Sequence, residues 1–165
     1  MFKVNFKNIL LNSVIISVIF LIDRISKIYI LKIFELESAV DIYLATYLNL
    51  YLIWNKGIAF GLFSFEQNFI YHSVSFIILI IIIVLIFMII KSDGFKKYSL
   101  ISILGGAISN FFDRIYYSAV PDFIDLHYDD FHWFIFNVAD IFITIGVICL
   151  ILDELFFYKK NNEIK

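Results

Sequence analysis

Residues 68–90 read NFIYHSVSFIILIIIIVLIFMII and form the longest uncharged apolar run of the chain. A helix of about 20 apolar residues crosses a bilayer, so this run predicts a transmembrane helix. Other apolar segments lie on both sides of it, and together they predict four spans, at about 8–31, 68–90, 98–114 and 134–157. The expected fold class is therefore an all-α integral membrane protein.

The composition of the whole chain agrees with a membrane location. Of the 165 residues, 62% are hydrophobic and 17% are charged, whereas about 25% are charged in a typical soluble domain. A soluble fold of this size cannot bury so much apolar surface. The formal net charge of −2 also lacks the basic excess of a nucleic-acid binder. We expect a single domain over residues 1–165, with no nucleic-acid partner and, since Cys149 is the sole cysteine, no internal disulfide.

The distribution of lysines predicts the orientation. Lysines precede the first span, fill the connection between the second and third, and follow the fourth: Lys3, Lys7, Lys91, Lys96, Lys97, Lys159, Lys160 and Lys165. Four spans place all of these on one face, which the positive-inside rule makes cytoplasmic, together with both termini. The longer, acid-rich loops 32–67 and 113–133 then lie outside. Residues 41–53, rich in aromatic and β-branched side chains, predict a strand or hairpin on the outer surface.

The first apolar segment resembles a signal peptide in its basic start and apolar middle. It is followed by Asp23-Arg24 rather than by a small-residue cleavage site, so we expect it to be retained.

Ionisable residues within the spans are costly and usually face the interior of the helix bundle. Asp23 and Lys27 are four residues apart, on one helix face, where they can pair. Asn110, Asp113 and Arg114 share a second helical stripe near the outer end of the third span. Each set is read either as a structural ion pair or helix cap, or as part of a functional site.

Further carboxylates lie at the same membrane face. Asn137 and Asp140 are three residues apart on one face of the fourth span, and Asp122 and Asp125 follow Pro121 in the outer loop. Two close aspartates cannot both ionise easily, so such a pair shares a proton. One carboxylate can then take a proton from water while the other protonates the substrate. The residues therefore suggest metal-free hydrolysis, but spacing does not choose between Asp122 and Asp125.

Other chemistries find less support. The sequence has no HExxH zinc helix and no GxSxG nucleophile elbow. The outer loop 113–133 could instead hold a metal ion, with His127, Asp129, Asp130 and His132 as its ligands. These residues lack helical spacing, so we expect no metal and no other cofactor. His72 is read as an interfacial histidine.

Five segments resemble, in order, the motifs of the lipoprotein signal peptidase (signal peptidase II) family of bacterial membrane aspartyl proteases. They are DRISK at 23–27, WNKGIAFG at 54–61, GGAISNFFDR at 105–114, VPDFID at 120–125 and FNVAD at 136–140. The family patterns are D-R-x-S-K, N-x-G-x-A-F-G, G-G-A-x-G-N-x-x-D-R, V-V-D-F-I and F-N-x-A-D. Each match alone is weak, but together they cover nearly the whole chain.

The resemblance implies a role for each matching residue. Asp122 and Asp140 occupy the positions of the family's catalytic pair, and Asp125 becomes a neighbour. The positions that line the site and bind substrate or inhibitor are Asn55, Asn110, Arg114 and Asn137. The positions that support it are Asp23, Lys27, Gly106 and Asp113. Ser109 and Pro121 depart from the family, which usually has Gly at the first position and an apolar residue at the second; Pro121 removes one backbone donor beside Asp122.

The resemblance also implies an activity and a setting. The expected reaction removes the signal peptide from diacylglyceryl-modified bacterial prolipoproteins, just before the lipidated Cys. The expected partners are these precursors, membrane lipids and globomycin-type inhibitors, with the enzyme a monomer in the cytoplasmic (inner) membrane and its site at the outer face. The loop 32–67 would form the family's outer β-type cradle, with a short outer-loop helix.

Two rival functions remain open on the residues alone. A small transporter or ion-conducting subunit would use a charge relay of Asp23, Lys27, Asp113, Arg114 and Asp140. Such a relay predicts charges spread across the bilayer, whereas these cluster near one end. A non-catalytic assembly subunit would tolerate loss of the Asp140 carboxylate.

Overall fold

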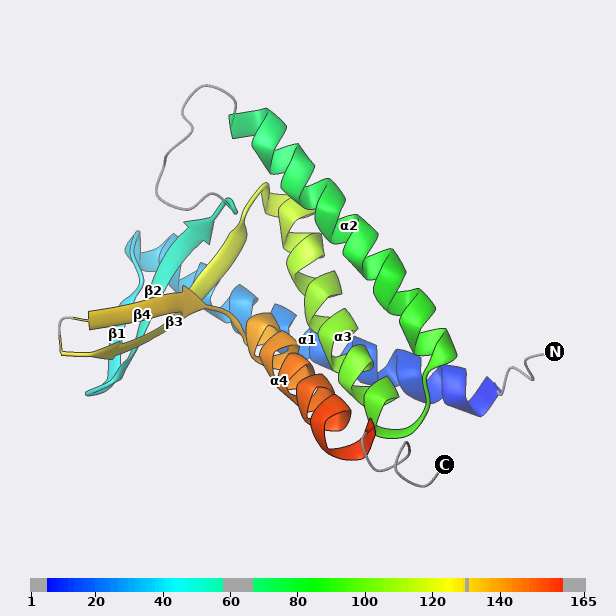
Figure 1. Ribbon diagram of the computed structural model, residues 1–165. Coiled ribbons are helices and arrows are strands. Elements are labelled where there is room, and N and C mark those ends of the chain that lie inside the picture. Colours follow the sequence, from blue (N-terminus) through cyan, green and yellow to red (C-terminus); the bar gives the residue numbers. More distant parts are fainter. Residues whose placement is uncertain (1–5, 58–66, 130, 159–165) are drawn as a thin grey trace.

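The computed structural model describes residues 6–57, 67–129 and 131–158, as four helices followed by a π-helical turn, together with a four-stranded sheet (Figure 1). The helices are α1 Phe6–Glu37, α2 Gln67–Lys91, α3 Gly94–Tyr117 and α4 Val138–Asp153, and the turn is η2 Glu154–Tyr158. The strands are β1 Asp41–Ala45, β2 Leu48–Asn55, β3 Val120–Tyr128 and β4 Phe131–Phe136.

Two of these helices are long and apolar enough to cross a membrane, α1 and the Tyr71–Lys91 part of α2. Both helices expose large apolar side chains, such as Ile25 on α1 at 66% and Ile83 and Phe87 on α2 at 58% and 57%. Such a surface is stable against lipid rather than water. The chain is thus mostly helical with two candidate membrane spans, and the four-span arrangement remains an expectation.

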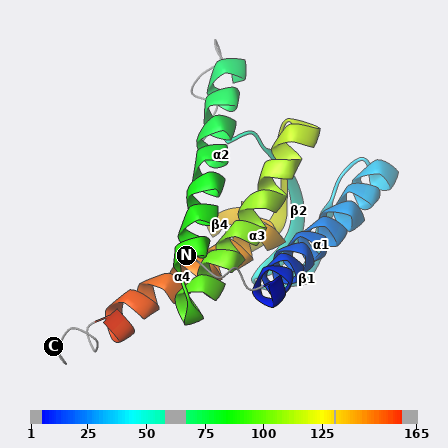
Figure 2. The same cartoon turned by 90° about the vertical axis from the view of Figure 1, so that its right-hand side faces the viewer.

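Helix α3 is the central helix and packs against α1, α2 and α4 (Figure 2). Its buried residues Leu100, Ile101 and Leu104 form a core with Ile82 and Leu85 of α2. On the opposite side α4 approaches α3 at Gly106, where an added Cβ would lie 2.5 Å from the Ala139 backbone oxygen. Gly105 likewise lies close to Ile19 of α1, whose side chain would be 3.0 Å from an added Cβ, so the two glycines let α1 and α4 pack closely against α3.

Gly106→Ala is expected to lower the free energy of unfolding by about 1–3 kcal/mol, the usual cost of overpacking a core. The new Cβ meets a backbone oxygen, which cannot rotate away, so α3 and α4 must separate. Reversible unfolding in mixed detergent micelles measures the change. Gly105→Ala is the matched control, because its Cβ meets only the Ile19 side chain at 3.0 Å. Equal losses for the two variants would contradict this account of the α3–α4 contact.

The sheet lies at one end of the helices and is antiparallel, in the order β1-β2-β3-β4 (Figure 1). The expected hairpin within 41–53 is confirmed as β1 and β2. Phe123 of β3 packs on Ile30 of α1 and on Val40, which fixes the sheet to the helices. Pro121 is tolerated because β4 pairs with β3 only from Ile124 onward, so the missing N–H leaves no ladder bond unmade on that side.

Three expected boundaries differ from the structure. Residues 134–136 belong to β4, and α4 begins only at Val138, because the buried Asn137 caps the helix. Helix α1 extends beyond the expected 8–31, and α3 beyond the expected 98–114. The described parts of the outer loops hold strands and no further helix. Residues 58–66, and with them part of the expected site for a short outer-loop helix, lie outside the described residues.

Candidate active site

The start of α4 is held by a reciprocal pair of hydrogen bonds. The Asn137 side-chain oxygen accepts from the Asp140 backbone N–H at 3.2 Å, and Asp140 Oδ2 accepts from the Asn137 backbone N–H at 3.1 Å. This capping box satisfies two donors that would otherwise be free at the helix end. It also fixes the Asp140 carboxylate at the junction of sheet and helix.

Asn137 reaches the second carboxylate as well. Its side-chain Nδ2 donates to Asp122 Oδ1 at 2.6 Å, while Asn55 Nδ2 donates to Asp122 Oδ2 at 2.9 Å. Ile53 of β2 stands opposite Asp122, and this register brings Asn55 within reach. One asparagine therefore connects Asp122 and Asp140, which lie 18 residues apart on different elements.

The surroundings of Asp122 favour its protonated form. The residue is 3% exposed. Burial, and to a lesser degree the charge of Asp140, raise the pKa of the Asp122 carboxyl to about 6, against the opposing effect of the Asn55 and Asn137 hydrogen bonds. A carboxyl that titrates near neutral pH can exchange a proton with substrate or water.

The other Asp140 oxygen is oriented through α3. Asn110 Nδ2 donates to Asp140 Oδ1 at 2.8 Å, and Asn110 Oδ1 accepts from Lys27 Nζ at 2.9 Å. A lysine ammonium can only donate hydrogen bonds, so the Asn110 amide must turn its oxygen toward Lys27. The amide NH₂ must then face Asp140, which makes Lys27 a positioning residue for this carboxylate.

Lys27 stands in a buried network of ion pairs between α1 and α3. Its Nζ lies 2.7 Å from Asp23 and 2.6 Å from Asp113, and Arg24 Nη1 lies 2.6 Å from Asp113. The two carboxylates and two cations balance, as buried charges require. The expected pairing of Asp23 with Lys27 is confirmed, and both side chains are fully buried.

The network extends to α4 through Asp23. Its Oδ1 accepts from the Ala139 backbone N–H at 2.8 Å, and its Oδ2 accepts from Ser109 Oγ at 2.5 Å. Ser109, which stands where the family usually has Gly, thus makes a specific hydrogen bond. Its hydroxyl was the available signal, but nothing in the sequence indicated that Asp23 lies opposite.

Arg114 is placed differently from Asp113, its neighbour in the sequence. Its Nε and Nη1 are buried without a hydrogen-bond partner among the described residues. The guanidinium lies against Gly57, where an added Cβ would be 3.0 Å from Nη1. Gly57 in turn donates its backbone N–H to Asn55 Oδ1 at 2.7 Å. Arg114 therefore adjoins Asn55 with two donors that no described residue satisfies.

Asp140 borders an apolar groove. Asp140 is one wall of a hollow of about 370 Å³, and its other walls include Trp133, Phe134, Phe136, Ile141 and Ile145. Asp125 lies apart from this groove, because its carboxylate contacts His127 and His132 of the β3–β4 hairpin. The structure thus brings together Asp122, Asp140, Asn55, Asn110 and Asn137, and separates Asp125 from them.

Two solved structures share this architecture, and both are described as bacterial membrane enzymes determined by the in meso method. The first aligns with a TM-score of 0.74 and 28% identity, over 88% of this chain and 93% of the other. The second aligns with a TM-score of 0.69 and 30% identity, over 87% of each. The fold is therefore that of a bacterial membrane enzyme.

Sequence relatives are more specific. The lipoprotein signal peptidase of Pelagibacter ubique (strain HTCC1062) is 62% identical over 162 residues, which is 98% of each chain. That of Anaplasma phagocytophilum (strain HZ) is 40% identical over 158 residues, 94% of this chain and 96% of the relative. A family model described as signal peptidase (SPase) II matches residues 15–156. The chain belongs to the signal peptidase II family, and the resemblance drawn from its motifs is confirmed.

Proposed function

We propose that this protein is a membrane aspartyl endopeptidase that removes signal peptides from diacylglyceryl-modified prolipoproteins, with Asp122 and Asp140 as its catalytic pair. The observation that carries the proposal is that Asn137 donates to both carboxylates, of which Asp140 is a wall of an apolar groove. Membership of the signal peptidase II family supplies the substrate class.

The proposed mechanism needs one proton on the pair. The ionised carboxylate takes a proton from a water molecule, whose oxygen attacks the carbonyl carbon of the scissile peptide bond. The protonated carboxyl donates its proton to the carbonyl oxygen. Collapse of the tetrahedral intermediate then returns a proton to the leaving amine and cleaves the C–N bond. Asn110 orients Asp140, Asn55 orients Asp122, and Asn137 holds both.

The groove and Arg114 suit the two parts of the substrate. Aromatic and branched walls at Trp133, Phe134 and Ile145 favour an acyl chain or an apolar signal segment. The unpartnered donors of Arg114 favour peptide carbonyls or a lipid ester. Holding the scissile bond between these anchors supplies the orientation that hydrolysis needs. Cleavage just before the lipidated Cys would place that residue at the Asp140 end of the groove.

The proposed membrane orientation puts the sheet and the carboxylate pair at the outer face. The end of α2 and the start of α3 lie at the opposite end of the helices from the sheet (Figure 1). They carry Lys91, Lys96 and Lys97, which the positive-inside rule assigns to the cytoplasm.

Purified protein in proteoliposomes tests the proposal with a diacylglyceryl-modified precursor and the same precursor without lipid. Mass spectrometry should locate one cut immediately before the lipidated Cys, inhibited by a globomycin-type compound and insensitive to EDTA. Equal cleavage of the unlipidated precursor, or a cut elsewhere, would overturn the proposed specificity. Activity lost to EDTA without a change in Tm, and restored by zinc, would overturn the metal-free mechanism.

The pH dependence of cleavage should report the Asp122 titration. If the shared proton is required, kcat/KM falls as pH rises through about 6, where Asp122 loses its proton. Asn55→Ala removes a hydrogen bond that favours the ionised carboxylate of Asp122, so the pKa of Asp122 should rise. The fall in kcat/KM should then occur about one pH unit higher. Profiles for both enzymes measure the shift. Asp93→Asn, an exposed residue at the start of α3, serves as the control. A fall in kcat/KM that stays at the same pH or moves to lower pH would contradict the role of Asn55.

A further inference from the structure

Three strands of the sheet place a second polar cluster on one face, separate from the carboxylate pair. Asp125 and His127 are two residues apart on β3, and the pairing with β4 shifts by one residue between them. Both side chains nevertheless lie on one side of the sheet, since their carboxylate and imidazole approach each other. His132 of β4 stands opposite His127, and Asn49 of β2 stands opposite Asp125. The pairing of β2, β3 and β4 therefore gathers two imidazoles, a carboxylate and an amide.

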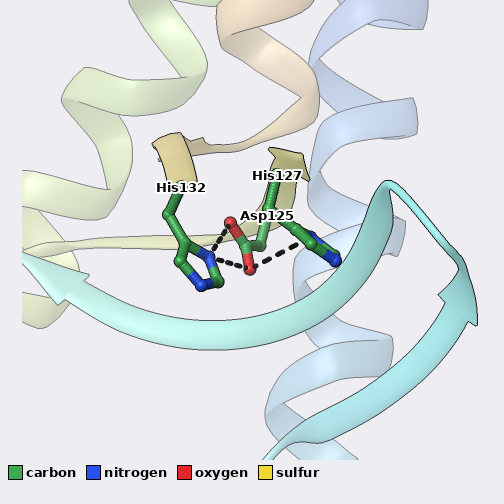
Figure 3. A group of neighbouring side chains, drawn as sticks. All are labelled: Asp125, His127 and His132. Carbon is green, nitrogen blue, oxygen red and sulfur yellow. Dashed lines mark hydrogen bonds and ion pairs between the residues drawn. The ribbon is translucent and has the colours of Figure 1, made fainter. Parts of the chain in front are cut away.

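The side chains converge as this register requires (Figure 3). His132 Nδ1 lies 2.9 and 3.0 Å from the two Asp125 oxygens, and His127 Nδ1 lies 3.7 Å from Asp125 Oδ2. One potential ligand atom from each of the three residues falls within 4.8 Å of the other two. The two imidazole rings are stacked with centroids 5.2 Å apart.

Two atoms of this cluster are buried without a hydrogen-bond partner among the described residues, His127 Nδ1 and Asn49 Oδ1. Buried polar atoms normally have partners, and a water molecule or an ion is one way to satisfy an unpartnered one. A hollow of about 400 Å³ reaches the cluster, with walls formed by Asp41, Asn49, Tyr51, Asp125, His132 and Ile135. The His132 side chain is 56% exposed and the Asp125 side chain 3%, so an ion can reach a largely buried carboxylate from solvent.

We propose that Asp125, His127 and His132 form a binding site for a divalent transition-metal ion, with Zn²⁺ as the occupant and Asn49 Oδ1 beside the open position. Imidazole nitrogens with one carboxylate suit Zn²⁺ and its neighbours in the transition series, whereas Ca²⁺ and Mg²⁺ take oxygen ligands. Zinc binds such atoms at about 2.0–2.2 Å, so tetrahedral ligand atoms lie about 3.4 Å from one another. The Asp125 oxygen Oδ2 lies 2.9 Å from His132 Nδ1 and 3.7 Å from His127 Nδ1, so both distances are within about 0.5 Å of that spacing.

The ion would have a structural role. It would join the β3–β4 hairpin to itself and, through Asn49, to β2, and so stiffen the strand that supplies Trp133 and Phe134 to the groove. The sequence offers a different set in this loop, His127, Asp129, Asp130 and His132, with no metal expected there. Of that set, Asp129 is exposed at the hairpin turn with a left-handed φ of 49°, and Asp130 lies outside the described residues. Asp125 takes their place.

Metal binding by the full chain in detergent tests the site without reference to peptidase activity. Protein stripped with EDTA is titrated with ZnCl₂ against a chromogenic competitor, and with CoCl₂ to read the visible absorption of bound Co²⁺. We expect saturable binding of one ion per chain and a rise in Tm on adding Zn²⁺. His127→Ala, His132→Ala and Asp125→Asn should each weaken binding by at least about tenfold.

His72→Ala is the matched control, because His72 is the third histidine of the chain and lies on α2. It should bind Zn²⁺ as the unaltered protein does. His132→Ala decides the matter if the buried variants fail to fold, since its side chain is mostly exposed. Binding unaffected by His132→Ala, binding equally reduced by His72→Ala, or no saturable binding would each overturn the proposal. The proposed peptidase is tested separately, by cleavage in EDTA.

Discussion

Asp122→Asn and Asp140→Asn are each expected to lower precursor cleavage by at least about 10³-fold, within the range that general acid–base groups contribute. Each substitution keeps the size of the side chain and removes its ability to carry the shared proton. Another side chain cannot take over either role, because each carboxylate is held in place by its own amide donor. Asn137 donates to Asp122, and Asn110 donates to Asp140. Single-turnover assays on purified, lipid-reconstituted variants measure the loss.

The double variant separates a catalytic pair from two independent supports. Residues that act as one unit give non-additive losses, so Asp122→Asn combined with Asp140→Asn should cost about as much as either alone. Two structural residues would instead add their effects. Asp93→Asn, at the other end of α3, should cleave at the normal rate. Normal turnover by either single variant, with an unchanged Tm, would remove that residue from the mechanism.

Much of the helical fold could be predicted because lipid leaves few alternatives to a long apolar helix. Residues 68–90 became most of α2, and the four-residue spacing of Asp23 and Lys27 indicated their ion pair. The β1–β2 hairpin was also predicted from its β-branched and aromatic residues. Local pattern is sufficient where the interaction itself is local.

The sequence could not show contacts made across elements. The start of α4 was placed too early because apolar strand residues 134–136 are continuous in hydropathy with the helix that follows. Asp113 pairs with Arg24 and Lys27, 89 and 86 residues away in the chain. Asn137 serves as helix cap and as donor to Asp122 only because β3 returns beside it. The choice between Asp122 and Asp125 likewise depends on register, since the two carboxylates contact different partners.

Lys27→Met is expected to lower the free energy of unfolding by about 3–5 kcal/mol, the cost of breaking a buried ion pair by removing one partner. The fully buried ammonium contacts Asp23, Asp113 and Asn110, and Arg24 can compensate only Asp113. One uncompensated negative charge is then left between α1 and α3. Unfolding in mixed detergent micelles measures the loss. Lys91→Met is the matched control, because Lys91 is exposed and contacts only the Phe87 ring, so its loss should stay below about 1 kcal/mol.

A compensating substitution distinguishes stability from positioning. Asp23→Asn combined with Lys27→Met restores charge balance, so the double variant should recover part of the lost stability, by a coupling of about 0.5–3 kcal/mol. Cleavage should nevertheless stay low, since Lys27 no longer selects the oxygen side of the Asn110 amide and nothing then directs its NH₂ at Asp140. Recovery of activity in step with stability would show that Lys27 acts through the fold alone. Stability recovered without activity would establish that the lysine orients the Asp140 carboxylate through Asn110.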